Sequence, residues 1–301
     1  MSTALLLLPD FLLIVLGFVV CRYTSLDRSV WDGAERLVYY LLFPVLLFGS
    51  IVKSPLSIAS TTPLALCGIG ITVSGIALAY ALRLLPRVDP ALHASGAQTA
   101  FRFNSYIALA LAERLGGVQG VAWTALLVAL CVPLANVAAV WPLARHGGQS
   151  VGRELLRNPL IVATLAGLAA NFAGLKFPDA AATTLQRIGA AALPLGLMAV
   201  GAGLRFGALR DAPWLAAALL GIRHVALPGI ALAQVFALAL SDAQRQLVVA
   251  FSAMPTASSA YVLAARLGGH GGYVAGLVTV STLLGMAGVP LWLAMAALLA
   301  R

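Results

Sequence analysis

The sequence predicts an all-α integral membrane protein with ten transmembrane helices, arranged as two inverted repeats of five helices each. Three observations support this fold: an apolar composition, a series of apolar stretches of membrane-spanning length, and a resemblance between the two halves of the chain. The 301 residues are 61% hydrophobic and 10% charged, with a mean hydropathy of +0.97. About a quarter of the residues of a soluble domain are charged, because its surface faces water. Most of this surface must therefore face lipid, which makes membrane lipid a partner.

The apolar stretches are separated by glycines, prolines and charged clusters. A helix needs about 20 mainly apolar residues to cross the hydrocarbon core of a membrane. The ten predicted spans cover approximately residues 4–22, 33–53, 62–84, 92–115, 118–143, 159–176, 181–204, 213–238, 243–267 and 271–298. The longest polar connector, residues 145–158, divides the chain near its middle. We therefore expect a first five-helix repeat in residues 1–144, a short cytoplasmic connector, and a second, inverted repeat in residues 159–301.

The arginines and lysines favour one orientation in the membrane. With the N-terminus outside, the predicted cytoplasmic gaps carry 11 basic residues and the outer gaps carry 6, while Arg102 and Arg223 fall inside spans. Basic residues concentrate in the cytoplasmic loops of membrane proteins. The bias predicts a multi-pass protein of the plasma (inner) membrane with both termini outside. Because orientation explains the formal net charge of +9, nucleic acid is not expected as a partner.

The two halves of the chain match each other at a shift of 150 to 157 residues. The matching residues are Pro9 with Pro159, Gly17 with Gly167, Pro44 with Pro194, Gly75–Ala79 with Gly229–Ala233, Arg114–Gly117 with Arg266–Gly269, and Val132–Leu134 with Val289–Leu291. Because five is an odd number of spans, the second half enters the membrane from the opposite side, and the repeat is inverted. Inverted repeats recur in secondary transporters, where the two halves exchange conformations and give alternating access.

Spans four and nine carry polar clusters at corresponding positions near mid-span. The clusters consist of Arg102, Asn104 and Ser105 in span four, and of Met254, Pro255, Thr256, Ser258 and Ser259 in span nine. Pro255 has no N–H for the carbonyl four residues back, so the helix should open there. Freed backbone groups at membrane depth are tolerated when they are buried in protein or line a wet cavity. Transporters with inverted repeats bind substrate at such interrupted helices, so we predict the substrate site here.

Arg102 is the residue expected to bind a carboxylate of the substrate. A charged side chain at mid-membrane needs a partner or a cavity, and a guanidinium can hold a carboxylate with two parallel hydrogen bonds. The alternative is a structural arginine that snorkels or binds backbone carbonyls. Asn104 either contacts the substrate or links two helices by a hydrogen bond.

Weaker candidates lie in other spans. Pro44 and Pro194 either kink their helices or line the site. Asn136, Ser281 and Thr282 are further lining candidates. Arg223 and His224 are ionisable residues inside span eight, for which structural pairing is favoured over substrate contact, and His224 is also a candidate for proton coupling.

No pattern in the sequence predicts a metal site, a cofactor or an enzyme active site. Cys21, Cys67 and Cys131 lack the spacing of metal ligands or redox pairs. The four histidines are scattered, and paired acids within the spans are missing. We therefore expect neither cofactors nor catalytic residues, and we do not expect an enzyme.

These features resemble the auxin efflux carrier family of permeases, within the superfamily of bile-acid and arsenite transporters. The resemblance rests on Leu42–Pro44, Arg102–Asn104, Asn158–Pro159, Leu193–Pro194 with Gly201 and Gly203, Met254–Pro255, and Ser281–Thr282 with Pro290. It implies ten helices in a 5+5 inverted arrangement, in which the broken fourth and ninth helices cross at the binding site with Asn104 and Pro255. It also implies small carboxylates as substrates, and bacterial members are similar to malonate permeases. The short connector resembles the compact prokaryotic type.

Together these features predict a secondary transporter that moves small organic anions, chiefly carboxylates, by alternating access. A sodium-coupled bile-acid-type symporter is one alternative, although the sequence has no mid-span acids that would help bind sodium. A passive channel or facilitator is the other, because a repeat by itself does not establish coupled transport. A homodimer is left open.

Overall fold

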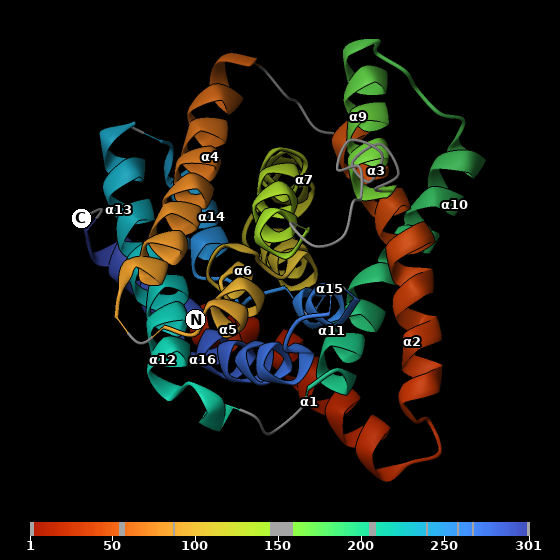
Figure 1. Cartoon of the computed structure of the whole chain (residues 1–301). Helices are drawn as coiled ribbons and strands as arrows, with labels where there is room; N and C mark the ends of the chain where they lie inside the picture. The colour runs from red at the N-terminus through yellow and green to blue at the C-terminus, as the bar shows by residue number, and fades with distance from the viewer. Residues whose placement is uncertain are drawn as a thin grey trace. The chain divides into compact units, whose positions relative to one another are not determined.

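The computed structural model of the chain describes residues 3–53, 58–86, 88–144, 159–204, 209–238, 240–257, 259–266 and 268–299. All regular secondary structure in these ranges is helical (Figure 1). The predicted connector, residues 145–158, lies outside them. The chain forms two compact units. The first comprises Met1–Thr62, Tyr106–Ala129 and Gly152–Gly203, and the second comprises Pro63–Ser105, Leu130–Val151 and Leu204–Arg301.

The first unit contains the helices that correspond to predicted spans one, two, six and seven. They are α1 (Thr3–Tyr23), α2 (Arg28–Leu37), the π-helical turn η1 (Val38–Leu42), α3 (Phe43–Lys53), α9 (Pro159–Phe172), α10 (Asp179–Ala190) and α11 (Ala192–Ala202). The two prolines of the internal repeat disturb their helices in this unit. Pro44 follows the wide turn η1, and Pro194 lies three residues after the break between α10 and α11 at Ala191. Both effects follow from the missing proline N–H.

Helix α1 packs closely along α11 because glycines remove the side chains at the contact. A Cβ atom on Gly17 would lie 1.9 Å from the carbonyl oxygen of Met198, and one on Gly201 would lie 1.8 Å from that of Ile14. Backbones can approach so closely only where small residues face each other, as they commonly do between membrane helices. Gly201 therefore serves helix packing.

Helices α3 and α9 form a second close pair in the first unit. Gly167 of α9 faces Ile51 of α3, and its Cβ position would be 3.1 Å from the Ile51 Cβ. The Asn171 amide donates hydrogen bonds to the carbonyls of Ile51 and Val52 at 2.9 and 3.2 Å. These carbonyls lie in the last turn of α3, where the helix itself supplies no donors.

Helix α7 (Ser105–Ala144) is two helices joined by a reversal at Gly117, which has φ 53° and ψ −141°. A Cβ on Gly120 would lie 2.3 Å from the carbonyl oxygen of Ala112. In a straight helix, residues eight positions apart are separated by about 12 Å. The chain therefore folds back at Gly117, a conformation that glycine adopts without steric cost. This confirms the predicted turn between residues 115 and 118.

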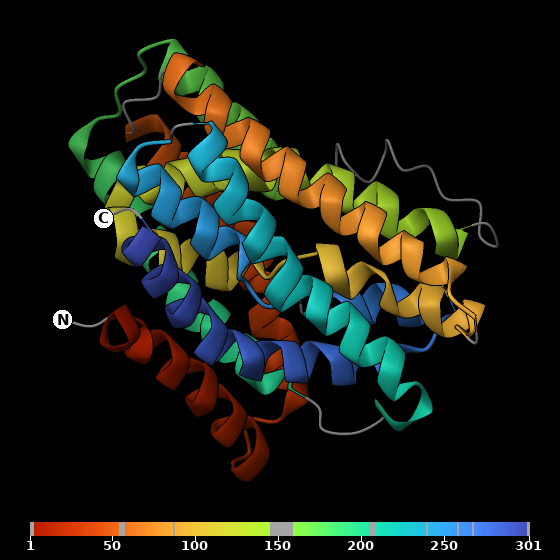
Figure 2. The ribbon, with the colours of Figure 1, turned by 90° about the vertical axis from the view of Figure 1, so that its left-hand side faces the viewer.

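The second unit contains the remaining helices. They are α4 (Ile58–Ala81), η2 (Leu82–Leu84), α5 (Pro90–Gly96), α6 (Gln98–Phe101), the end of α7, η3 (Leu209–Asp211), α12 (Pro213–Gly221), the π-helical turn η4 (Ile222–Ala226), α13 (Leu227–Ala237), α14 (Asp242–Ser252), α15 (Ala260–Arg266) and α16 (Gly271–Leu299). Figure 2 shows α12, η4 and α13 as one continuous helical run. Like η1, η4 precedes a proline, Pro228.

Six helical stretches within the described residues are long and apolar enough to cross a membrane. They are Arg28–Lys53, Thr61–Leu84, Pro90–Val140, Asp179–Ala202, Pro213–Ala237 and Gly271–Leu299. Two shorter apolar helices, Phe11–Tyr23 and Val162–Phe172, lie at predicted spans one and six. Span nine is divided into α14 and α15, so neither part reaches spanning length. The all-α membrane fold class is confirmed, and the number of ten spans stays a prediction.

Candidate functional site

The helix of predicted span four is interrupted where the polar cluster lies. Helix α6 ends at Phe101, Arg102 has an extended backbone (φ −77°, ψ 141°), and α7 begins at Ser105. Residues 102–104 are thus unwound, as the sequence predicts. The Asn104 side chain is buried, with 2% of its surface exposed, although it lies in a segment without helical hydrogen bonds.

The helix of predicted span nine is interrupted in the same way. Helix α14 ends at Ser252, residues 253–257 are not helical, and α15 begins at Ala260. Pro255 supplies the local cause, because it cannot donate to the carbonyl of Phe251, four residues earlier. Met254 and Thr256 are fully buried. Ser258 lies outside the described residues.

The two unwound segments meet in the second unit. The Asn104 backbone N–H donates to the Pro255 carbonyl oxygen at 2.8 Å. Beside this bond, the rings of Phe103 and Phe251 pack with their centroids 4.5 Å apart. Each segment therefore satisfies a backbone group that the other helix has freed, which is the condition for unwound backbone at membrane depth.

Arg102 connects the same two segments through its side chain. Its guanidinium donates to the Gln98 side-chain oxygen at 2.8 Å and to the Ser259 hydroxyl at 3.2 Å. The side chain is half-buried. Both acceptors are neutral and weaker than a carboxylate, which could replace the Ser259 hydroxyl as an acceptor for the guanidinium.

Arg223 reaches the second unwound segment from η4. Its Nε donates to the Met254 carbonyl at 2.6 Å, and its Nη2 donates to the carbonyls of Ser252 and Phe251 at 2.9 and 3.3 Å. Only 2% of the Arg223 surface is exposed. The sequence indicated a structural role for this residue, but the carbonyls that it binds lie about 30 residues further along the chain and could not be identified from local pattern.

Ser281 of α16 holds the next residue of this segment. Its hydroxyl accepts the Thr256 backbone N–H at 2.9 Å and lies 2.8 Å from Nε2 of His224. The Thr256 hydroxyl is buried and makes no hydrogen bond to any described residue. Thr282, in contrast, donates to the carbonyl of Val278 in its own helix.

Gly285 lies one turn beyond Ser281 and contacts the proline of the break. A Cβ on Gly285 would lie 3.0 Å from Cδ of Pro255 and 3.2 Å from its Cγ. Sequence reasoning missed Gly285 and Gln98 as parts of this cluster. The spacing of four residues between Ser281 and Gly285, which places both on one helix face, was the available signal.

A family model described as membrane transport protein matches residues 142–293, about half of the chain and all of α12 to α16 except the last turns. The chain belongs to this family. It is the auxin efflux carrier family that the sequence motifs indicated. Family membership and the apolar helices together make the chain a multi-pass membrane protein.

A protein of Rhizobium meliloti (strain 1021) named "Putative malonate transporter" is 25% identical over 301 aligned residues. The alignment covers 94% of this chain and 92% of that protein, so it includes both unwound segments. The membrane transport family model itself covers the segment in span nine, together with Arg223 and Ser281, and not the segment in span four.

Three other predicted site residues of this membrane transport protein, Pro44, Pro194 and Asn136, lie outside the two unwound segments. Pro44 and Pro194 belong to the first unit, where Pro44 is half-buried and Pro194 is exposed. Asn136 is half-buried in the second part of α7. The structure thus places Arg102, Asn104, Met254 to Thr256, Ser259 and Ser281 near the crossing of the two segments.

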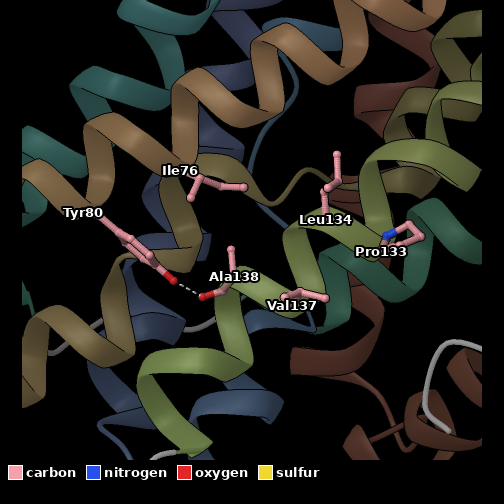
Figure 3. Close-up of a pocket in the computed structure, with 6 residues that line it drawn as sticks. All are labelled: Ile76, Tyr80, Pro133, Leu134, Val137 and Ala138. Atoms are coloured by element: carbon pink, nitrogen blue, oxygen red, sulfur yellow. Dashed lines mark hydrogen bonds between the residues drawn. The ribbon is translucent and has the colours of Figure 1, made fainter. Parts of the chain in front are cut away.

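A groove of about 470 Å³ lies between α4 and α7 in the second unit (Figure 3). It is lined by Ile76, Tyr80, Pro133, Leu134, Val137 and Ala138. The Tyr80 hydroxyl donates to the Ala138 carbonyl, as the dashed line shows. Because the lining is apolar and carries no cation or amide side chain, the groove suits apolar groups and not a carboxylate. None of the predicted site residues lines it.

The part of the chain that the structure describes contains no group of three or more His, Cys, Asp or Glu side chains that could hold a metal ion. Cys67 and Cys131 are buried, unpaired thiols.

Proposed function

We propose that this membrane transport protein is a secondary transporter that moves small organic anions, chiefly carboxylates, by alternating access. The supporting observation is the crossing of two unwound segments, joined by the hydrogen bond from Asn104 to Pro255. Interrupted helices that cross inside a membrane bundle are the usual substrate sites of transporters built from inverted repeats. At this crossing the chain gathers a guanidinium, an amide and two hydroxyl side chains: Arg102, Asn104, Thr256 and Ser259.

The inverted repeat is part of the proposal, and two features of the structure support it. In the first unit, α1 packs on α11 and α3 packs on α9. Helices α1 and α11 are predicted spans one and seven, and α3 and α9 are predicted spans two and six. The repeat relates span one to span six and span two to span seven, so the two pairs are equivalent. Both copies of the Arg-Leu-Gly-Gly motif also contain a glycine with positive φ, the fourth residue in the first copy (Gly117, 53°) and the third in the second (Gly268, 74°).

The substrate class follows from the chemistry of the crossing. A guanidinium binds a carboxylate with two charge-assisted hydrogen bonds, and an amide can donate to a remaining oxygen. The name of the Rhizobium relative points to malonate, which carries two carboxylates. We therefore propose dicarboxylates such as malonate as the first substrates to test.

The predicted topology completes this proposal. It has ten spans in the plasma (inner) membrane with both termini outside, with residues 1–144 and 159–301 as the two repeats and residues 145–158 as a cytoplasmic connector. The distribution of basic residues supports this orientation. Nε2 of His224 lies 2.8 Å from the Ser281 hydroxyl, which accepts from the Thr256 N–H of the crossing, so His224 stays the candidate for proton coupling.

The test is counterflow in proteoliposomes. Purified protein is reconstituted into vesicles loaded with unlabelled malonate, and uptake of labelled malonate is measured against vesicles loaded with buffer. A carrier that alternates between two sides should take up label faster into the malonate-loaded vesicles. Equal uptake in both preparations would indicate a passive channel, and a requirement for a sodium gradient would favour the sodium-coupled symporter. No uptake of any carboxylate would contradict the proposed substrate class.

A further inference from the structure

Arg223 and Ser281 replace two consecutive hydrogen bonds that helix α14 loses at its end. In a continuous helix, the Phe251 carbonyl would accept from residue 255 and the Ser252 carbonyl from residue 256. Residue 255 is proline and has no N–H. Nη2 of Arg223 donates to both carbonyls instead, and the N–H of Thr256 turns to the Ser281 hydroxyl.

These bonds hold the unwound segment through two consecutive carbonyls, which accept from different donors. The Met254 carbonyl accepts from Nε of Arg223, and the next carbonyl, that of Pro255, accepts from the Asn104 N–H. Arg223 and the first unwound segment therefore bind consecutive carbonyls of this segment. The Arg223 guanidinium is buried and its hydrogen bonds go to the backbone, so it has little surface left for a substrate.

The charge of Arg223 is permanent, because a guanidinium stays protonated in proteins. Within the described residues no ion pair involves Arg223. Its counter-charges are the carbonyl dipoles at the C-terminal end of α14, which carry only partial negative charge. A positive charge thus lies buried within two residues of the crossing, where screening by water and salt is weak.

We propose that Arg223 is a positioning residue that also sets the charge selectivity of this site. It keeps the segment 251–256 open, and its charge raises the affinity for anions in proportion to their charge, without contact with the substrate. This inference rests on the proposed function and adds to it a second cation, beside Arg102, that selects dianions over monoanions.

Ser281 offers a control that changes the geometry of this segment without removing a charged side chain. Ser281 binds the neighbouring N–H of Thr256, and its position is supported by His224. Pro228, four residues after His224, has no N–H to donate to the His224 carbonyl, which accepts instead from the Trp292 indole at 2.9 Å. Replacing the Ser281 hydroxyl therefore loosens the segment and removes no charged side chain.

The experiment compares malonate with its half-amide, malonamate, which carries one negative charge fewer. Dissociation constants are measured at one pH and ionic strength for the full-length wild-type protein and for Arg223→Gln, Arg223→Lys and Ser281→Ala, all in lipid nanodiscs. Because Coulomb energy scales with charge, Arg223→Gln should weaken malonate binding by about 10-fold and malonamate binding by about 3-fold. Ser281→Ala should weaken both by the same factor. Arg223→Lys keeps the charge and should keep the wild-type ratio of the two constants.

The inference is overturned if Arg223→Gln leaves both constants unchanged or weakens both anions equally, as Ser281→Ala does. If Arg223→Gln does not fold, an altered ratio in Arg223→Lys overturns it in the same way, and an unaltered ratio supports it. If the wild-type protein binds malonate, these outcomes decide only the role of Arg223 and leave the proposed function intact. A wild-type protein that binds neither anion contradicts the proposed function itself.

Discussion

The two unwound segments occupy corresponding places in the two halves of the chain, yet different chemistry stabilises each of them. The segment in span four is stabilised by neutral groups: the Gln98 side chain, the Ser259 hydroxyl and the Pro255 carbonyl. The segment in span nine is stabilised by the buried cation of Arg223, which binds three carbonyls, and by Ser281.

The difference suggests separate tasks for the two intramembrane arginines. Arg102 is half-buried, and its guanidinium donates to the side chains of Gln98 and Ser259, so these two bonds can be exchanged for bonds to a substrate. Arg223 is almost fully buried and its hydrogen bonds go to the backbone, which is costly to leave unsatisfied in a membrane. We therefore expect Arg102 to bind substrate and Arg223 to hold the site. Four substitutions test this division, in addition to those at Arg223 itself.

The largest effect is expected for Arg102→Ala. Removing one partner of a buried charge-assisted pair costs about 2–5 kcal/mol, so malonate affinity should fall by about 30-fold or more. Thermal stability of the purified protein should change little, because the bonds to Gln98 and Ser259 that are lost go to neutral side chains. Isothermal titration calorimetry measures the affinity. Arg36→Ala, which removes an exposed arginine of α2, is the matched control for net charge and should bind malonate normally. Unchanged binding in Arg102→Ala would remove Arg102 from the site.

Gly285→Ala should have the next largest effect. Its Cβ would lie 3.0 Å from Pro255, so the unwound segment must shift, at a cost of about 1–3 kcal/mol. Both the midpoint temperature of unfolding and the affinity for malonate should fall. Gly288→Ala is the control, because a Cβ at that position of the same helix meets no atom within 4 Å. Equal behaviour of the two variants would show that the contact between Gly285 and Pro255 has no energetic weight.

Asn104→Ala distinguishes the contribution of the Asn104 side chain to binding from that of its backbone N–H to the crossing. The hydrogen bond to Pro255 comes from the backbone N–H and survives the substitution, so the protein should stay folded. A lost hydrogen bond to a charged ligand should lower malonate affinity by about 10-fold. Asn136→Ala, on the second part of α7, is the matched control. If Asn136→Ala has the larger effect on malonate affinity, the site lies elsewhere than proposed.

Ser259→Ala should have the smallest effect. It removes one neutral acceptor from Arg102, and the guanidinium keeps its bond to Gln98. Malonate affinity should change by about 3-fold or less, in either direction, because a neutral hydrogen bond contributes about 0.5–1.5 kcal/mol. A loss as large as that of Arg102→Ala would mean that Ser259 itself contacts the substrate.

Much of this architecture is readable from local sequence. Apolar stretches of about 20 residues predict membrane helices because each stretch must match the thickness of the hydrocarbon core by itself. The interruption near Pro255 is local as well, since the missing N–H belongs to that residue. The interruption at Arg102–Asn104 was predicted from its polar cluster and from the internal repeat. The reversal near Gly117 follows from a pair of glycines between two apolar stretches.

The helices, the two helix breaks and the polar side chains at those breaks could therefore be predicted without a structure. The groups that replace the lost hydrogen bonds could not: Arg223 binds the carbonyls of α14, Ser281 accepts from the Thr256 N–H, and Pro255 accepts from the Asn104 N–H. The same holds for Gly285, whose missing side chain makes room for Pro255. The physical reason is range. Helix formation and helix breaking depend on residues within one or two turns, whereas these contacts join residues 25 to 151 positions apart and depend on how the helices pack.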